Sequence, residues 1–279
     1  MTCFIALLFL VSSAWAASPQ IVLSSHTLQP GQTLRVEVDG LSPDAKLRVL
    51  FNKKSYPCYP VGPNAQRALI GVPLGTPPQS LPLALKSADP DASSSPLAYT
   101  AVSISSRNYP TENINFSQAK TSLAKNEHRE SALIHRKAAI LRKEQSWEGT
   151  FLPPVSGPSI APFGLHRTRN GTQNAGFHKG MDFRSPKGAP VLASNAGIVE
   201  LAAPLKAHGK TILLNHGQGV MTIYLHMSSL RVKPGQKVTK GQIIGKVGST
   251  GLSTAPHVHW QVFVHGVPVD PKQWMETEF

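Results

Sequence analysis

The chain has 279 residues, of which 41% are hydrophobic, and this length and composition are ordinary for a soluble protein with two domains. Beyond residue 16 no apolar run is long enough to cross a bilayer, which excludes a polytopic membrane protein. Lys and Arg outnumber Asp and Glu by 28 to 15, and the resulting net charge of +13 indicates polyanionic surroundings.

The N-terminus resembles a secretory signal. Residues 4–11 form an apolar run, and Ala14-Trp15-Ala16 has the small-x-small form of a cleavage site. The run is too short for a membrane anchor, so we expect residues 1–16 to be a signal peptide and the mature protein to have no stable membrane span. None of the charged side chains lies in the first 20 residues, so the +13 stays on the mature chain. Export argues against nucleic acid as a partner and favours anionic cell-envelope polymers.

Cysteine usage excludes an internal disulfide. Cys3 is lost with the signal peptide, and Cys58 remains alone. A lone cysteine is either a nucleophile or a packed side chain, and Cys58 lies far in sequence from the His-rich part of the chain. A buried structural role is therefore expected for Cys58.

Residues 17–105 alternate apolar and polar side chains between turn formers, as in Leu34-Arg35-Val36-Glu37-Val38 before Asp39-Gly40. This pattern predicts a small N-terminal β domain with short strands, because Pro-rich breaks such as Gly75-Thr76-Pro77-Pro78 recur. No titratable cluster stands out there, so a binding, covering or regulatory role is expected.

Residues 106–146 are expected to be a helical connector. The stretch 116–147 lacks Pro and Gly, and apolar residues such as Leu133, Ile134 and Leu141 recur at helical spacing. Seven basic and three acidic residues fall in 117–146, which indicates a solvated helix face or a surface for an anionic partner.

Residues 147–279 are rich in Gly and in short β-branched runs, such as Thr211-Ile212-Leu213-Leu214, and little resembles a long helix. Strands joined by tight Gly turns predict an antiparallel sheet sandwich or barrel. The overall expectation is a mainly β protein with two β domains joined by a helical connector.

Three short segments of this last part place histidines in suggestive patterns. His178 and Asp182 are four residues apart and share a face in a helix or a strand. His257 and His259 share one strand face, where they could supply two metal ligands, one ligand and one proton-handling group, or two structural side chains. His226 ends an apolar strand, and alone it would be a core or edge residue.

Together, His178-x-x-x-Asp182, Tyr224-x-His226 and His257-x-His259 resemble, in order, the motifs of the lysostaphin-type, or LytM-like, zinc endopeptidases. The resemblance covers residues 147–274 and extends to surrounding residues, among them Pro162-Phe163-Gly164, Gly180-Met181-Asp182-Phe183, Asn215-His216-Gly217 and Gly248-Ser249-Thr250-Gly251. Residues 67–74 are also similar to an N-terminal domain that precedes some of these peptidases.

The resemblance implies a site in which His178, Asp182 and His259 bind Zn²⁺, while His226 and His257 act as catalytic side chains without binding it. It implies a zinc metalloendopeptidase that cuts peptide cross-links of bacterial peptidoglycan through a zinc-activated water, in the periplasm or cell envelope. Peptidoglycan stem peptides are then the substrate. Two alternatives stay open: an inactive LytM-like activator of cell-wall amidases, and a secreted protease of Gly-rich proteins.

One position departs from the family pattern, since Gln261 stands where many relatives carry Glu. The remaining histidines have no role in the resemblance: His216 is expected to be structural, and His166, His208 and His265 are expected at the surface. The N-terminal domain, tethered by the connector, is expected to regulate access to the substrate groove.

Overall fold

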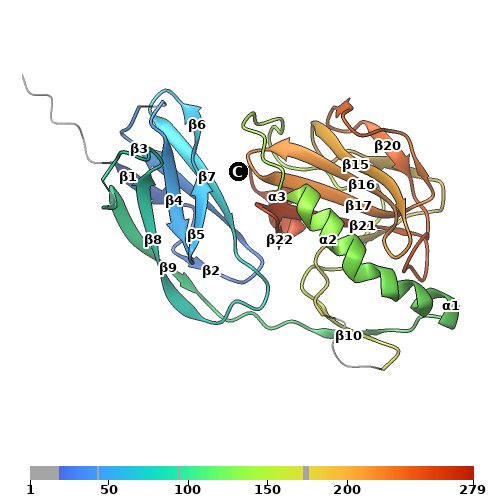
Figure 1. Cartoon of the computed structure of the whole chain (residues 1–279). Coiled ribbons are helices and arrows are strands. Elements are labelled where there is room, and N and C mark those ends of the chain that lie inside the picture. Colours follow the sequence, from blue (N-terminus) through green and yellow to red (C-terminus); the bar gives the residue numbers. More distant parts are fainter. Residues whose placement is uncertain (1–18, 43, 94, 172–175) are drawn as a thin grey trace, which may run out of the picture.

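The computed structural model describes residues 19–279 except positions 43, 94 and 172–175, so the expected signal peptide lies outside the described residues. The described chain is mainly β, with an N-terminal β region, a short helical stretch and a C-terminal antiparallel sheet (Figure 1). This confirms the predicted fold class. Within the described part, no helix has the length and apolar character that crossing a membrane requires.

The N-terminal β region, residues 20–104, is built from two sheets that enclose one apolar core. The first sheet is antiparallel and has the order β1 (Gln20–Leu23), β3 (Thr33–Asp39), β7 (Ala65–Gly71), β6 (Tyr59–Gly62). The second has the order β2 (Thr27–Leu28), β9 (Ala98–Ile104), β8 (Gln79–Ser87), β4 (Leu47–Phe51), β5 (Lys54–Pro57). The alternation in Leu34, Val36 and Val38 buries all three on one face, as the period-2 pattern predicts.

The connector, residues 106–146, combines a strand with helices. Its strand β10 (Thr111–Ile114) pairs in parallel with β12 (His166–Arg169) of the following region. The helices α1 (Gln118–Thr121), η1 (Ser122–Asn126) and α2 (Glu127–Ala138) follow. Acidic residues in the first turn of α2 and basic residues in its last turn favour the helix, because they complement its dipole.

The C-terminal region is dominated by one large antiparallel sheet. Its strand order is β11 (Ser159–Ala161), β13 (Met181–Arg184), β21 (His257–Val264), β17 (Val220–Met227), β16 (Gly209–Gly217), β15 (Gly197–Leu205), β19 (Lys237–Val238), with β22 (Val267–Val269) also paired to β21. A smaller sheet has the order β14 (Pro190–Leu192), β20 (Ile243–Lys246), β18 (Ser229–Leu230), and the chain ends near α3 (Pro271–Glu276).

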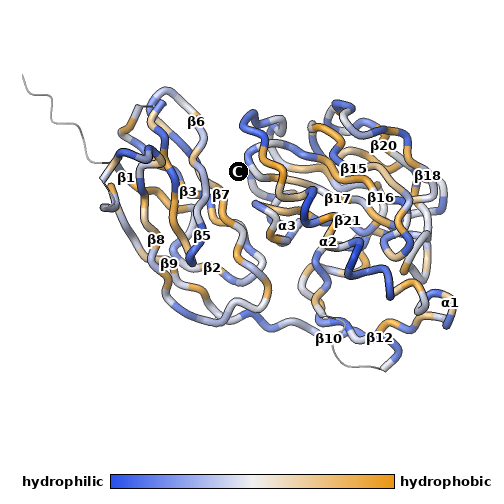
Figure 2. Tube along the Cα trace, in the orientation of Figure 1, coloured by the Kyte–Doolittle hydropathy of each residue, from blue (hydrophilic) through white to orange (hydrophobic). Residues whose placement is uncertain are grey.

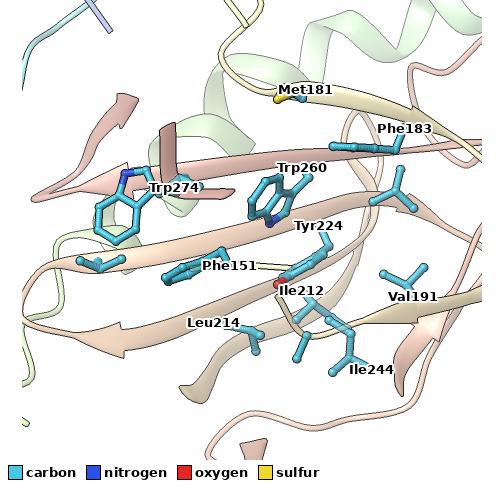
Figure 3. Packing of buried hydrophobic residues seen from close by; sticks show 14 of the residues in the cluster. Phe151, Met181, Phe183, Val191, Ile212, Leu214, Tyr224, Ile244, Trp260 and Trp274 are labelled. Carbon is cyan, nitrogen blue, oxygen red and sulfur yellow. The ribbon is translucent and has the colours of Figure 1, made fainter. Parts of the chain in front are cut away.

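The main core lies on one face of the large sheet. Figure 3 shows Trp260 and Tyr224 from β21 and β17 packed with Phe151, while Val191 and Ile244 approach from the smaller sheet. All five side chains are buried, and each removes enough apolar surface from water to stabilise the fold by roughly 1.5–3 kcal/mol. The large sheet is therefore held rigidly from this side.

The opposite face of the large sheet carries a second apolar cluster, which α2 covers. Ile134 and Ala138 of α2 pack with Ile223, Leu225 and Phe263 of the sheet. Figure 2 shows that α2 is otherwise largely hydrophilic, whereas β17 and β21 are mainly hydrophobic. The connector thus covers part of the sheet face opposite the main core.

The N-terminal β region contacts the C-terminal region beside β22 and α3 (Figure 1). The indole Nε1 of Trp274 donates a hydrogen bond to Thr33 Oγ1 at 3.0 Å. Arg67 of β7 donates to Gln218 Oε1 at 2.6 Å, and its guanidinium lies over the ring of Trp147. These buried polar contacts hold the two regions against each other, because moving the regions apart without admitting water would leave hydrogen-bonding groups unpaired.

Candidate metal centre

Two neighbouring strands bring the ligand candidates together. In the antiparallel pairing of β13 with β21, Asp182 lies directly opposite His259, so both side chains leave the sheet on the same face. His178 precedes β13 in an extended segment whose backbone bonds Leu165 and Gly164. Gly180 allows this approach, since a Cβ there would lie 2.4 Å from the carbonyl oxygen of Trp260 and 2.8 Å from His259 Nε2.

Three ligand atoms converge at one point. His178 Nε2 lies 3.0 Å from Asp182 Oδ1 and 3.0 Å from His259 Nδ1, and His259 Nδ1 lies 2.8 Å from Asp182 Oδ1. All three residues are buried. Ligand atoms of a tetrahedral zinc site stand about 3.3 Å apart, because each bond is about 2.0–2.1 Å long. The observed triangle is within a few tenths of an ångström of that spacing.

The hydrogen bonds behind these atoms suit a cation. His178 Nδ1–H donates to the carbonyl oxygen of Pro162 at 2.7 Å, which leaves the lone pair on Nε2 in the neutral ring. His259 Nε2 faces Gln261 Oε1 at 3.5 Å, which leaves its lone pair on Nδ1. Burial lowers the pKa of His259 to about 4, so its ring is neutral at pH 7.

Asp182 supplies the negative charge. Burial acts to raise its pKa, but hydrogen bonds from the His178 and His259 rings, in the protonated form that donates to Asp182, outweigh burial and hold the pKa well below the ordinary value. Its second oxygen, Oδ2, accepts a hydrogen bond of 2.7 Å from Arg167 Nη2. Two neutral imidazoles and one carboxylate are a donor set that binds a divalent metal, so the residues fit the metal ion that a metallopeptidase requires.

Two further histidines stand beside this group. His257 Nδ1–H donates to Ala255 O and His226 Nδ1–H donates to Thr250 O, both at 2.8 Å, so both Nε2 atoms are left with a lone pair in the neutral rings. The two ring centroids are 4.9 Å apart, and His257 Nε2 lies 3.9 Å from Asp182 Oδ1. Burial, followed by the nearby His257 and His259, lowers the pKa of His226 well below its ordinary value.

A backbone irregularity brings His226 to the site. Strict alternation along β17 would place His226 on the face of Tyr224, which is the main core, and not beside Leu225 and His259. Instead, His226 has a φ of 65°, in the left-handed region. Such a conformation costs roughly 1–2 kcal/mol for a residue other than Gly, and here it turns the ring towards His257.

A cavity of about 630 Å³ surrounds these side chains and forms a groove. It is lined by His178, Asp182, His226, His257 and His259, together with cationic side chains of the same region: Arg167, Arg169, Lys179 and Arg184. The residue that sequence reasoning missed is Arg167, which contacts the ligand candidate Asp182. Its only signal in the sequence is the alternation of Arg167 with Arg169, which places both on one side of β12.

Four other histidines, His166, His208, His216 and His265, are not part of the ligand group. His216 is fully buried in the main core, where its ring bonds Ala196 O at 2.6 Å and Thr222 Oγ1 at 2.8 Å. The expectation that His166, His208 and His265 lie at the surface is wrong, because all three are half-buried. They pack respectively against Phe177, the carboxylate of Glu130 and Tyr56.

The thiol of Cys58 has no catalytic setting. It is half-buried against the apolar core of the N-terminal β region. Burial raises its pKa to about 12, so the reactive thiolate is absent at neutral pH.

Residues 176–271 match the model of peptidase family M23. Over 99 residues the chain is 42% identical to the peptidoglycan DD-endopeptidase ShyA of Vibrio cholerae, and this match covers 36% of this chain and 23% of that protein. Over 95 residues it is 39% identical to the DD-carboxypeptidase/endopeptidase Mpg of Neisseria meningitidis, and this match covers 34% of this chain and 22% of that protein. The matched part thus spans less than a quarter of these curated relatives.

A solved structure extends the likeness to most of the chain. It is a Pseudomonas aeruginosa protein described as a peptidase M23, with a TM-score of 0.67 and 26% identity over 90% of this chain and 95% of that one. The segment that matches the family model contains all five of His178, Asp182, His226, His257 and His259. The C-terminal region of the chain therefore contains a segment, residues 176–271, that matches peptidase family M23.

Proposed function

We propose that the protein is a zinc-dependent endopeptidase that hydrolyses D-alanyl peptide cross-links of bacterial peptidoglycan. The observation that carries this proposal is the convergence of His178 Nε2, Asp182 Oδ1 and His259 Nδ1 at 2.8–3.0 Å in the groove. These residues would hold the metal, and the oxygen of Asp182 that points away from the others is neutralised by Arg167. When bound, zinc supplies a Lewis acid that polarises the scissile carbonyl and lowers the pKa of a water.

His257 is the residue we assign to proton transfer. Its Nε2 atom faces the groove with a lone pair, and the bond from Nδ1–H to Ala255 O fixes the ring. His257 can therefore accept a proton from the attacking water and later donate it to the leaving amine. The carbonyl of Ala255 supports the protonated ring, because the Nδ1–H bond strengthens when the ring is charged.

His226 is assigned a different part of the reaction. Its pKa lies well below the ordinary value because of burial and the nearby histidines, so it is a poorer proton acceptor than an unperturbed imidazole. As a neutral ring held by Thr250 O, it orients the attacking water through its Nε2 lone pair. The strained backbone at this residue supports a functional role, because such strain persists only where the surroundings require it.

Two observations support a peptidoglycan substrate. The relatives that share 39–42% identity are named as endopeptidases of peptidoglycan and as DD-carboxypeptidase/endopeptidases. In addition, Arg167, Arg169, Lys179 and Arg184 make the groove wall cationic, which suits stem peptides that carry free carboxylates. Such a substrate places the protein in the cell envelope, in line with the proposed signal peptide at residues 1–16.

The division of labour along the chain is also part of the proposal. Residues 17–105 form an accessory domain, residues 106–146 a connector, and residues 147–279 the peptidase domain. The high net positive charge of the chain suits a surrounding of anionic envelope polymers.

A zinc measurement combined with digestion of purified sacculi tests the proposed function. The mature chain is expected to bind one zinc ion and to release cross-link-cleaved muropeptides, identified by mass spectrometry, with release stopped by a chelator and restored by zinc. A protein that binds no zinc and releases nothing would instead support an activator of amidases. Cleavage of Gly-rich proteins without any action on sacculi would support a general secreted protease.

A further inference from the structure

The groove is lined on one side by the connector and not by the N-terminal β region. Connector residues that line it include Glu112, Phe116, Glu127, Ile134 and His135, whereas no described residue of 19–104 does so. Helix α2 lies across the face of β16, β17 and β21 (Figure 1). The segment that reaches the groove is thus the connector itself.

The positive and negative side chains of the groove come largely from different regions of the chain. Among the described residues, the Lys and Arg side chains that line it are Arg167, Arg169, Lys179 and Arg184, and all belong to the C-terminal region. Apart from Asp182, the acidic side chains that line it within the described part of the chain are Glu112 and Glu127, and both belong to the connector. The connector therefore supplies negative charge to a positively charged wall.

Each of these acidic side chains is paired with an arginine of β12. Glu112 Oε2 accepts a hydrogen bond from Arg167 Nε at 3.1 Å, and Glu127 accepts two from Arg169, one at Oε1 from Nη2 at 2.8 Å and one at Oε2 from Nη1 at 2.5 Å. The paired side chains are between 18% and 40% exposed, so solvent reaches both pairs. Because solvent screens both pairs, a carboxylate of another molecule can replace either glutamate.

A third connector carboxylate fills a backbone pocket beside the groove. Glu130 of α2 accepts hydrogen bonds from the backbone N–H groups of Lys206, Ala207 and His208 at 2.7, 3.0 and 3.1 Å. The ring of His208 adds a bond of 2.9 Å from Nδ1. Successive backbone N–H groups that point at one spot form an anion-binding nest, and here the nest demonstrably holds a carboxylate.

The nest belongs to the same groove as the ligand candidates. Ala207 and His208 line the cavity, and the backbone N–H of His226 donates to His208 O at 3.2 Å. The turn that carries the nest is therefore coupled directly to a side chain of the site. Carboxylates are thus held at two places in this region, on β12 and on residues 206–208.

We propose that the connector is an internal acidic ligand of the groove, and that Arg167, Arg169 and the nest at residues 206–208 are the subsites that bind carboxylates of the peptide substrate. The inference rests on the proposed function, because it identifies how the substrate is recognised. An acidic peptide that enters the groove exchanges its own carboxylates for those of Glu112, Glu127 and Glu130. The connector and the substrate therefore compete for the same positions.

Binding of a stem tetrapeptide tests this proposal. A fluorescently labelled, uncross-linked tetrapeptide with free carboxylates contains no cross-link to cut, so its affinity is measurable by anisotropy on the zinc-loaded full mature chain. The double variant Glu112→Gln/Glu127→Gln removes the connector carboxylates that bond Arg167 and Arg169 while keeping side-chain shape. We expect it to bind the peptide about tenfold more tightly than the wild type, since two exposed ion pairs no longer compete.

Controls separate subsite binding from a general change of charge. Glu144→Gln, an exposed carboxylate of the same connector, is expected to leave the affinity unchanged. A tetrapeptide with carboxamides in place of carboxylates is expected to show no gain, and adding Arg169→Gln to the double variant is expected to remove much of it. The gain is also expected to shrink at high salt.

Equal gains for Glu144→Gln, equal affinity for the carboxamide peptide, or no gain in the double variant would each overturn the proposal. Adding Glu130→Gln to the double variant is expected to increase affinity further, with thermal unfolding as a check that the nest turn stays folded. Failure of the proposed function is distinguishable, because it appears as the absence of muropeptide release from sacculi and leaves the peptide-binding assay unaffected.

Discussion

The large sheet carries buried histidines on both faces, and the two groups are built in opposite ways. On the groove face, His178 and His259 direct lone pairs at the carboxylate of Asp182, so three acceptors meet without a donor between them. On the core face, His216 donates to Ala196 O and faces the hydroxyl of Thr222, whose oxygen in turn bonds Tyr224. The first group requires a cation, and the second is complete in itself.

The difference teaches how burial and hydrogen bonding separate function from stability within one sheet. The pKa values of His216 and His259 are both lowered to about 4 by burial, so the perturbed pKa alone does not distinguish them. What distinguishes them is the partner of the second ring nitrogen. A ring bonded at both nitrogens stabilises the core, whereas a ring with one nitrogen open towards other acceptors is arranged to bind a ligand.

Replacing a ligand candidate should give the largest effect on activity. His259→Ala is expected to abolish zinc binding and to reduce sacculus hydrolysis to background, well beyond the roughly 10–100-fold that changes around a ligand cause. Because the three acceptors repel one another without a metal, the metal-free variant should unfold at nearly the same urea concentration as the metal-free wild type. Zinc titration and urea unfolding measure the two quantities, and a variant that still hydrolyses sacculi would contradict the assignment.

Replacing the proton-transfer side chain should act on the reaction and leave the metal in place. His257→Ala is expected to lower kcat by about 10²–10⁴-fold, the usual range for loss of a general base. Zinc stoichiometry should stay at one per chain, because His257 Nε2 lies outside the triangle of ligand atoms. Loss of zinc together with activity would place His257 among the ligands.

The core histidine should affect stability and not the reaction. His216→Ala removes a fully buried ring with its two hydrogen bonds, and we expect the free energy of unfolding to fall by about 3–5 kcal/mol. Zinc binding and hydrolysis per folded molecule should be unchanged at temperatures where the variant is folded. A selective loss of activity in the folded variant would break the distinction between the two faces.

The pH dependence of stability should distinguish the same variant from the wild type. The pKa of His216 is lowered by burial to about 4, below the value of about 6.5 in an unfolded chain, so the unfolded state binds more protons between these values. The stability that neutral His216 provides is complete above pH 6.5 and is lost as the pH falls to 4. The difference in unfolding free energy between the wild type and His216→Ala should therefore shrink by about 3 kcal/mol, measured by urea unfolding at both ends of this range.

The smallest effect should come from the side chain behind His259. Gln261 faces His259 Nε2 at 3.5 Å, and Gln261→Glu replaces a neutral acceptor with a charged one. The charge makes the ring a more basic ligand, so zinc affinity should rise by up to about tenfold. Competition with a chromophoric chelator measures this change, and Gln261→Ala, which removes the acceptor, should lower the affinity. Equal affinities in all three proteins would show that this position does not act on the metal.

Much of the architecture follows from local patterns. The alternation Leu34, Val36, Val38 predicts a half-buried strand, and the structure shows that strand in the N-terminal β region. The family resemblance is likewise confirmed. Its motifs consist of residue types at fixed spacings, which can be recognised in a single sequence. The segment 116–147 contains helices between residues 118 and 138, as its pattern predicts. Strand β10 precedes them within the connector, and local patterns did not predict it because it forms by pairing with β12, a distant segment of the chain.

The sequence by itself determined which side chains are available and which faces of each strand they share, because the period of two places His257 and His259 together. Only the tertiary structure decided which of them meet. The register of β13 against β21 sets Asp182 opposite His259, and a left-handed backbone at His226 reverses the direction that alternation predicts. Arg167 and Glu112 meet in the groove, and Glu130 meets residues 206–208 beside it, through contacts between distant segments. Such contacts depend on the packing of the whole chain, so no local pattern of residues specifies them.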